Sequence, residues 1–134
     1  MRTAMHEVLV ADLKAPSVAR HHLDSWLREL PLTGAERHDL LLATSEAVAN
    51  VVDHAYPADH DGAEVTVLAE LQHRSEDDTS RVVITVTDAG CWRPIPVERD
   101  GRGRGLQMMR ACTDELRIET TTAGTQVTMV SRPI

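Results

Sequence analysis

The period of the hydrophobic pattern changes along the chain, and each change marks a predicted element. Residues 6–12 alternate apolar and polar side chains around Val8 and Val10, which predicts an edge strand. Apolar residues then recur at helical spacing from Pro16 to Leu30, and Pro31 ends this first predicted helix. The N-terminal part is therefore expected to fold as a strand followed by a helix.

A second helix over Ala35–Ala55 is the longest predicted element, and Tyr56-Pro57 ends it. Thr33 occupies the N-cap position, and Glu36 lies where its side chain completes a capping box. At about 100° per residue, apolar side chains fill one arc of this helix and polar side chains the other. The apolar arc contains Leu40, Leu41, Thr44, Ala47, Val48, Val51 and Val52. The polar arc contains Asp39, Glu46, Asn50, Asp53 and His54.

Beyond residue 63 the period becomes two, which is typical of strands with one buried face. Residues 63–71 and 81–87 are predicted as neighbouring antiparallel strands, joined by a polar hairpin loop over His73–Ser80. Residues 91–105 contain two prolines and three glycines. Such a density of helix and strand breakers predicts an irregular loop.

The C-terminal part predicts a short helix over Leu106–Cys112 and a last pair of strands. These strands are Glu115–Thr120 and Thr125–Ser131, with a turn at residues 122–124. The resulting order, β-α-α-β-β-α-β-β, predicts an α+β fold with two layers, in which a mostly antiparallel sheet carries helices on one face. Residues 1–134 are expected to form a single domain, because this length is typical of one.

Composition and charge remove several functional classes. Aromatic residues make up only 2% of the chain and the net charge is −7, so we expect no direct binding of nucleic acid. No apolar stretch is long enough to span a membrane and no signal peptide begins the chain, so a cytoplasmic location is expected. Cys91 and Cys112 form no paired motif and are interpreted as reduced thiols. The seven histidines lack the spacing of metal ligands.

Two short motifs place oxygen atoms where they can contact a ligand. Glu46 and Asn50 are four residues apart and share one face of the predicted helix, where they suit a general base and a ligand for Mg²⁺. Asp88 follows a strand, where its carboxylate can accept a hydrogen bond from the amine of a base, and Gly90 allows close approach to a flat ring. Taken alone, the first motif is also typical of a solvated helix face and the second of a turn.

Two further motifs are rich in glycine. Gly101-Arg102-Gly103-Arg104-Gly105 precedes a predicted helix, so its backbone N–H groups, the helix dipole and the arginines suit an anion such as phosphate. It lacks the Lys-Ser/Thr pair of a Walker loop. Gly124-Thr125 lies in the last hairpin. Taken alone, the first motif is also typical of a flexible linker and the second of a plain turn.

The four motifs in this order resemble those of one family. They are similar to the N, G1, G2 and G3 boxes of the Bergerat-type ATP-binding fold, which occurs in gyrase, Hsp90, histidine kinases and MutL. Within this superfamily of histidine-kinase-like (GHKL) ATPases, the segments SEAVANVVDHAYP and SVARHHL resemble the small anti-sigma factor serine/threonine kinases. The resemblance extends from about Met5 to Val130.

The resemblance implies a role for each matching residue. Glu46 matches the general base that orients the attacking hydroxyl, and Asn50 matches the Mg²⁺ ligand. Asp88 matches the residue that recognises adenine, with Gly90 beneath the ring and Thr125 supporting the adenine end. The phosphate loop corresponds to Gly101, Arg102, Gly103, Arg104 and Gly105. Arg20 matches a position used for contact with a protein partner.

The resemblance also implies a function. An ATP- and Mg²⁺-binding kinase of this kind sequesters a sigma factor and phosphorylates a serine or threonine of a STAS-type anti-sigma antagonist, and the family leads us to expect a homodimer. The alternative is a nucleotide-binding regulatory module that sequesters partners without significant kinase activity. This alternative arises because the sequence differs from the family pattern at one point. Many relatives have a second glycine after Asp-x-Gly, whereas this chain has Cys91-Trp92.

Overall fold

One five-stranded antiparallel sheet forms the centre of the computed structural model, which describes residues 2–57, 60–90 and 104–134. The strands lie in the order β1-β2-β3-β5-β4, and each neighbouring pair is antiparallel. Their bounds are β1 Ala4–Val10, β2 Glu64–Arg74, β3 Thr79–Asp88, β4 Glu115–Thr121 and β5 Gly124–Val130. β3 and β5 are therefore inner strands, and their ends at Asp88 and Gly124 meet at one end of the sheet.

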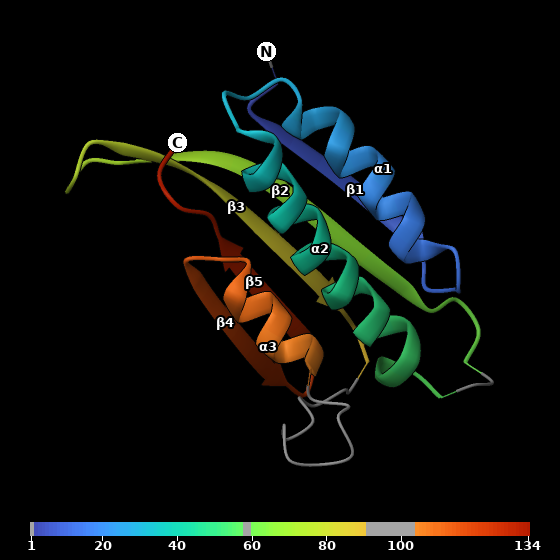
Figure 1. Ribbon diagram of the computed structural model, residues 1–134. Coiled ribbons are helices and arrows are strands. Elements are labelled where there is room, and N and C mark those ends of the chain that lie inside the picture. Colours follow the sequence, from blue (N-terminus) through green and yellow to red (C-terminus); the bar gives the residue numbers. More distant parts are fainter. Residues whose placement is uncertain (1, 58–59, 91–103) are drawn as a thin grey trace.

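The helices cover one face of this sheet, as Figure 1 shows. They are α1 Ala15–Leu27, α2 Gly34–Asn50 and α3 Arg104–Ala111, and α2 continues into a π-helix, η1, over Val51–Ala55. The predicted α+β fold with two layers is confirmed, and so is the predicted order of its elements. None of the helices in the described part of the chain is both long and apolar enough to cross a lipid bilayer.

The start of α2 has the predicted capping box. The Thr33 side chain accepts a hydrogen bond from the backbone N–H of Glu36 at 3.0 Å, and the Glu36 carboxylate accepts one from the backbone N–H of Thr33 at 2.8 Å. These two bonds satisfy backbone N–H groups that the first turn of a helix leaves unpaired. They fix where α2 begins, and hence which of its side chains face the sheet.

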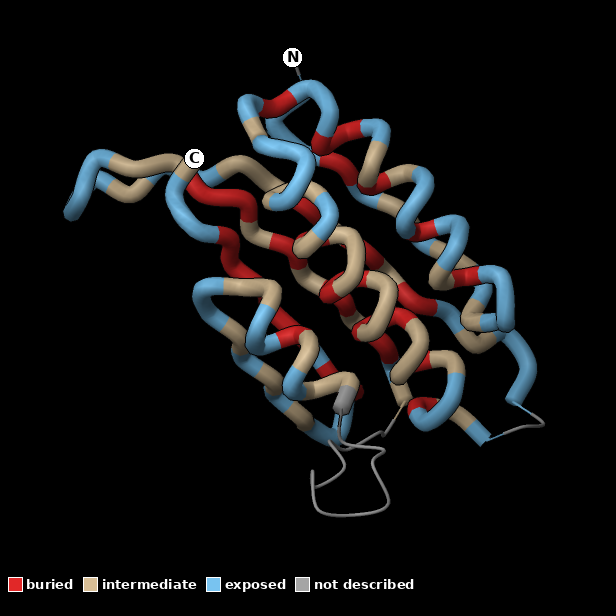
Figure 2. Tube along the Cα trace, in the orientation of Figure 1, coloured by how far each residue is buried: buried red, intermediate tan, exposed pale blue. Residues whose placement is uncertain are grey.

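The core lies between the two layers, and Figure 2 shows the buried residues along the inner sides of the helices and the middle of the sheet. It is built almost entirely from aliphatic side chains, because the chain has no phenylalanine. Trp26 is the largest fully buried side chain, and its indole N–H donates to the Arg2 carbonyl at 3.0 Å. That bond joins the end of α1 to the chain just before β1.

Several predicted bounds differ from the observed ones. The hairpin loop is shorter than predicted, because His73 and Arg74 pair with Ser80 and Thr79 and extend both strands. Strand pairing uses backbone groups, so polar side chains do not interrupt it where the hairpin extends into solvent. The first strand was predicted correctly as an edge strand, but Val8 and Val10 are 51% and 67% exposed and point away from the helices.

Cys112 is a free thiol, as the sequence indicated, whereas Cys91 lies outside the described residues. Burial raises the pKa of the Cys112 thiol, and the nearby Asp39 carboxylate raises it further. The thiol is therefore protonated, and less nucleophilic, at neutral pH.

Candidate functional site

The two candidate oxygen donors of α2 lie near its C-terminal end. Glu46 and Asn50 are both half-buried, and η1 begins directly after Asn50. Among the described residues, nothing donates a hydrogen bond to the Glu46 carboxylate or pairs with its charge. No three or more His, Cys, Asp or Glu side chains of the described residues form a group that could hold a metal ion.

Asp88 ends β3 and is only 6% exposed. Its Oδ1 accepts a hydrogen bond from the backbone N–H of Gly90 at 2.8 Å. This bond stabilises the corner that the backbone forms after β3, at residues 88–90. Across the ladder, Asp88 pairs with Thr125 of β5, which is 1% exposed. The two residues expected to contact the same base are therefore neighbours on adjacent strands.

The Tyr56 hydroxyl joins three segments next to this corner. It accepts a hydrogen bond from the backbone N–H of Ala89 at 3.0 Å and donates one to the carbonyl of Glu64, the first residue of β2, at 2.7 Å. Tyr56 directly follows η1, so these bonds attach the end of that helix to the corner after Asp88. The long helix and the strand end consequently keep a fixed spacing.

Three glycines mark the closest approaches between the segments of the site. A Cβ on Gly90 would lie 2.1 Å from the Ala55 carbonyl oxygen at the end of η1. A Cβ on Gly124 would lie 1.9 Å from the Asp88 carbonyl oxygen, and one on Gly105 would lie 1.9 Å from Oε1 of Glu46. Because no side chain fits at these distances, glycine is required for the present spacing.

The Gly105 contact brings the start of α3 against the carboxylate of α2. The rest of the predicted phosphate loop, Gly101, Arg102 and Gly103, lies outside the described residues, as does the side chain of Arg104. The structure therefore brings together Glu46 and Gly105 from two of the four motifs. It brings together Asp88, Gly90 and Thr125 from the others.

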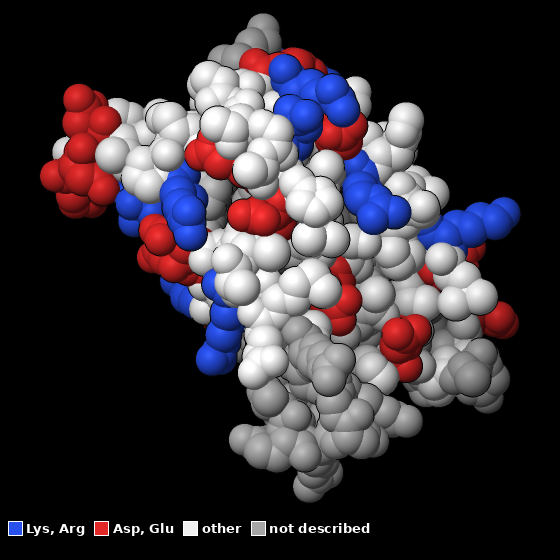
Figure 3. Space-filling model, in the orientation of Figure 1, with Lys and Arg blue, Asp and Glu red and all other residues white. Residues whose placement is uncertain are grey.

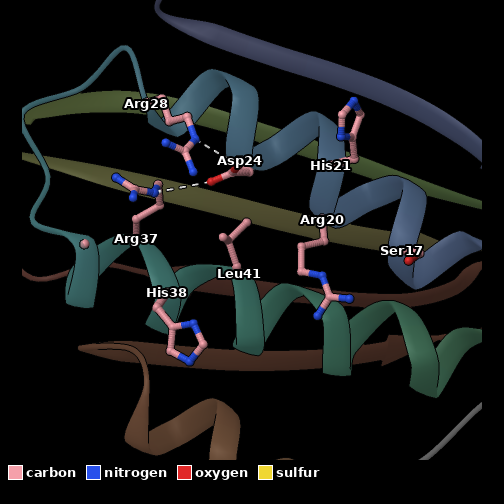
Figure 4. Close-up of a pocket in the computed structure, with 9 residues that line it drawn as sticks. Ser17, Arg20, His21, Asp24, Arg28, Arg37, His38 and Leu41 are labelled. Atoms are coloured by element: carbon pink, nitrogen blue, oxygen red, sulfur yellow. Dashed lines mark hydrogen bonds and ion pairs between the residues drawn. The ribbon is translucent and has the colours of Figure 1, made fainter.

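Arg20 does not belong to this group of residues. It is exposed on α1 and lines a groove between α1 and α2, drawn in Figure 4. A hollow of about 220 Å³ lies at the strand ends of the site: it is lined by Asp88, Gly124 and Thr125, and also by Thr87, Gln126 and Glu119. Neither cavity includes Glu46 or Asn50.

Residues 9–131 match the family described as the histidine kinase-like ATPase domain. The chain belongs to this family. The match covers nearly all of the chain, and it includes the helix with Glu46 and Asn50, the strand end at Asp88 and the hairpin with Thr125.

Among relatives of this ATPase domain is the anti-sigma F factor of Pasteuria penetrans. The two sequences are 32% identical over 126 residues, which cover 85% of this chain and 80% of that protein. A similar solved structure is that of the RsbU and RsbW domains of Rv1364c from Mycobacterium tuberculosis, with a TM-score of 0.76 and 29% identity. That likeness covers 98% of this chain, which spans about a third (33%) of the Rv1364c chain.

The histidine kinase-like ATPase domain also has features at this site that sequence analysis missed. Tyr56 was predicted to end a helix and belonged to the segment that resembles the N box, but no bonding role was predicted for it or for Ala55. Their roles depend on η1 and on the pairing of β2 with β3, which bring residues 55, 56 and 64 beside residues 89 and 90. The Tyr-Pro pair after the helix was the only signal in the sequence at this point.

Proposed function

We propose that this ATPase domain is an anti-sigma factor kinase that binds ATP with Mg²⁺, sequesters a sigma factor and phosphorylates a serine or threonine of a STAS-type antagonist. The observation that carries the proposal is the contact between Gly105 and Glu46. A glycine-rich loop before a helix suits phosphate, and a general base must lie beside the transferred phosphoryl group. The nearness of this carboxylate to the start of α3 supports the proposal that Glu46 is the general base.

The residues present fit ATP and Mg²⁺. Asp88 is a buried carboxylate held by the Gly90 N–H, which suits recognition of the exocyclic amine of adenine, and Thr125 lies across the ladder from it. Asn50 supplies one carboxamide oxygen, and Mg²⁺ in such sites takes few protein ligands because waters and phosphates complete its shell. When bound, the ion offsets the negative charge of the phosphates.

Glu46 is the proposed general base. Its carboxylate accepts the proton of the antagonist's hydroxyl, whose oxygen forms a bond to the γ-phosphorus while the bond to the bridging oxygen of ADP breaks. Glu46 is half-buried on a helix whose start is fixed by the capping box, which supports this role. Arg102 and Arg104 are proposed to stabilise phosphate charge from the loop before α3.

The test is transfer of radiolabelled phosphate from ATP to the antagonist, with ATP binding measured in parallel. Wild type is expected to transfer phosphate, and Glu46→Gln to lose transfer by about 10²–10⁴-fold while still binding ATP. Transfer by Glu46→Gln at the wild-type rate would contradict the role of Glu46. If wild type binds ATP but transfers nothing, the alternative of a sequestering module without kinase activity is correct, as the Cys91-Trp92 departure suggests.

The setting of this activity is also part of the proposal. A sigma factor works on the transcription machinery inside the cell, so we propose a cytoplasmic location. We propose protein partners and no direct contact with nucleic acid, which fits the net charge of −7. The homodimer expected from the resemblance remains a proposal, to be checked by light scattering.

A further inference from the structure

Tyr56 is the only tyrosine of the chain, and its hydroxyl lies at the end of the β2–β3 ladder. The register of these strands ends where Val65 faces Asp88. Glu64 and Ala89 are the next residues along, and they would face each other if the pairing continued. The hydroxyl lies between the two, because it accepts a hydrogen bond from the Ala89 N–H at 3.0 Å and donates one to the Glu64 carbonyl at 2.7 Å. It thus occupies the place of the next backbone hydrogen bond.

The direction of the backbone groups supports this interpretation. The Ala63 carbonyl accepts a hydrogen bond from the N–H of Ala11 at 2.9 Å, so residue 63 directs its backbone groups toward the β1 side. Successive residues of a strand direct theirs to opposite sides, and Glu64 therefore directs its carbonyl toward β3. A direct bond from the Ala89 N–H to this carbonyl would continue the ladder. The Tyr56 hydroxyl bridges the two groups instead and ends the ladder.

The bridge determines where the corner after β3 lies. Gly90 follows Ala89, and its N–H holds Oδ1 of Asp88 through a hydrogen bond of 2.8 Å. If the hydroxyl were absent, the Ala89 N–H would be drawn to the Glu64 carbonyl, because an unpaired backbone group is costly. Gly90 would then shift toward β2, and the carboxylate that it holds would change direction. The direction of the Asp88 carboxylate therefore depends on the Tyr56 hydroxyl.

We infer that Tyr56 is a positioning residue that sets the base selectivity of the proposed ATP site. By holding the corner in place, its hydroxyl directs the Asp88 carboxylate at the exocyclic amine of adenine, a donor, where guanine carries a carbonyl oxygen, an acceptor. ATP and GTP have the same charge, so the acidic side chains that Figure 3 shows near the C-terminal end of α2 act on both alike. The inference rests on the proposed function, because it assumes that Asp88 contacts the base.

Two variants separate the hydroxyl from the ring that carries it. The Tyr56 ring packs against the core, and its centroid lies 4.9 Å from that of the His60 ring. Tyr56→Phe keeps both contacts and removes only the hydroxyl, so the domain should remain folded. His60→Ala removes the neighbouring ring and keeps the hydroxyl, which makes it the matched control. If the two variants behave alike, the hydroxyl has no role of its own and the inference is wrong.

The test measures the dissociation constants of ATP and GTP, with Mg²⁺, by titration calorimetry. The quantity compared is the selectivity, defined as the dissociation constant of GTP divided by that of ATP. Tyr56→Phe should lower the selectivity by about fivefold or more, which corresponds to the net contribution of one hydrogen bond. His60→Ala should change it by less than about twofold. An unchanged selectivity in Tyr56→Phe would overturn the inference, and so would an equal loss of affinity for both nucleotides, since that would indicate a merely structural role.

A double-mutant cycle tests whether Tyr56 acts through Asp88. Asp88→Asn alone should lower the selectivity, because the amide can present a donor to the base amine. Tyr56→Phe added to Asp88→Asn should then cause no further loss. Losses that multiply in the double variant would show that the tyrosine does not act through the carboxylate, which would contradict the inference.

A spectroscopic measurement needs no substitution. Because the chain has one tyrosine, protein grown with fluorotyrosine gives a single fluorine NMR signal, from residue 56. Saturating ATP with Mg²⁺ should shift this signal, because contact with the base at the corner alters the hydrogen bonds of the hydroxyl, and GTP should shift it less. A signal that saturating ATP leaves unchanged would contradict the inference.

The inference and the proposed function fail in different ways. If wild type binds neither nucleotide, the proposed function is wrong and the inference is wrong as well. If wild type prefers ATP and Tyr56→Phe keeps the same preference, only the inference is wrong. If wild type prefers ATP but transfers no phosphate, the proposed kinase activity is wrong, whereas a lower selectivity of Tyr56→Phe would still support the inference, because selectivity is measured by binding.

Discussion

Replacement of Gly105 by alanine tests the contact on which the proposed chemistry depends. The new Cβ would lie 1.9 Å from Oε1, 2.6 Å from Cδ and 2.9 Å from Cγ of Glu46. All three atoms belong to the outer part of one side chain, which can rotate to another staggered conformation. Alanine also favours the helix by up to about 1 kcal/mol over glycine. The free energy of unfolding should therefore change by no more than about 1 kcal/mol.

The effect on catalysis should be much larger, because the carboxylate must leave its position. A positioned general base contributes about 10²–10⁴ in rate, which corresponds to roughly 3–5 kcal/mol of transition-state stabilisation. Gly105→Ala should thus reduce phosphate transfer to the antagonist by about 10²-fold or more. The Cβ points at Glu46. Because Gly105 also belongs to the proposed phosphate loop, ATP affinity is measured in parallel by titration calorimetry, and the loss of transfer should exceed any loss of ATP affinity.

Two other glycines provide the matched comparison. A Cβ on Gly90 or on Gly124 would meet backbone carbonyl oxygens, which cannot rotate away, and Gly124 also has a φ of +139°. Gly90→Ala and Gly124→Ala should therefore lower the free energy of unfolding by about 1–3 kcal/mol or more in a urea titration. The reasoning is refuted if Gly105→Ala is as destabilising as these two, or if it transfers phosphate at the wild-type rate. In a Glu46→Gln background, Gly105→Ala should cause no further loss of transfer.

Three further outcomes are expected. Asp88→Asn should weaken ATP binding and reduce discrimination against GTP in calorimetry, because its amide can present a donor where the base amine needs an acceptor; unchanged selectivity would show that Asp88 does not contact the base. Asn50→Ala should weaken ATP binding with Mg²⁺ present and have little effect in EDTA, and an equal loss in both would exclude Asn50 as a metal ligand. Thr44→Val should raise the free energy of unfolding by about 1 kcal/mol, because the buried Thr44 hydroxyl has no hydrogen-bond partner among the residues that the structure describes, and a lower midpoint of denaturation would contradict this.

Local signals in the sequence were sufficient to predict most of the framework. The capping residues Thr33 and Glu36, the helical spacing of apolar residues and the alternation after residue 63 each report an interaction between residues close in sequence. The side-chain directions of β1 were less predictable. The alternation of Val8 and Val10 is typical of side chains that face a core, but both are exposed, and Met5 is the buried residue of this edge strand.

The sequence predicts which residues belong to the site, but not how residues far apart in the sequence pack against one another. The spacing of Glu46 and Asn50 fixes a shared helix face, but nothing local reports that Gly105, some sixty positions later, packs against that carboxylate. The π-helix was also missed, because a change from i+4 to i+5 hydrogen bonding within five residues leaves no period in the hydrophobic pattern. The loop predicted over residues 91–105 falls mostly outside the described residues and stays a prediction, although α3 already begins at Arg104.

The burial of Trp26 has a practical consequence for following this protein in solution. The chain contains two tryptophans, Trp26 and Trp92, and the first is fully buried with its indole N–H bonded to a backbone carbonyl. An indole so enclosed emits at shorter wavelength than one in water, and its emission shifts when the core opens. In a Trp92→Phe variant, intrinsic fluorescence would therefore report global unfolding through Trp26 alone. The difference between that signal and the wild-type signal would isolate Trp92, two residues beyond Gly90, as a separate optical reporter for titrations with nucleotide.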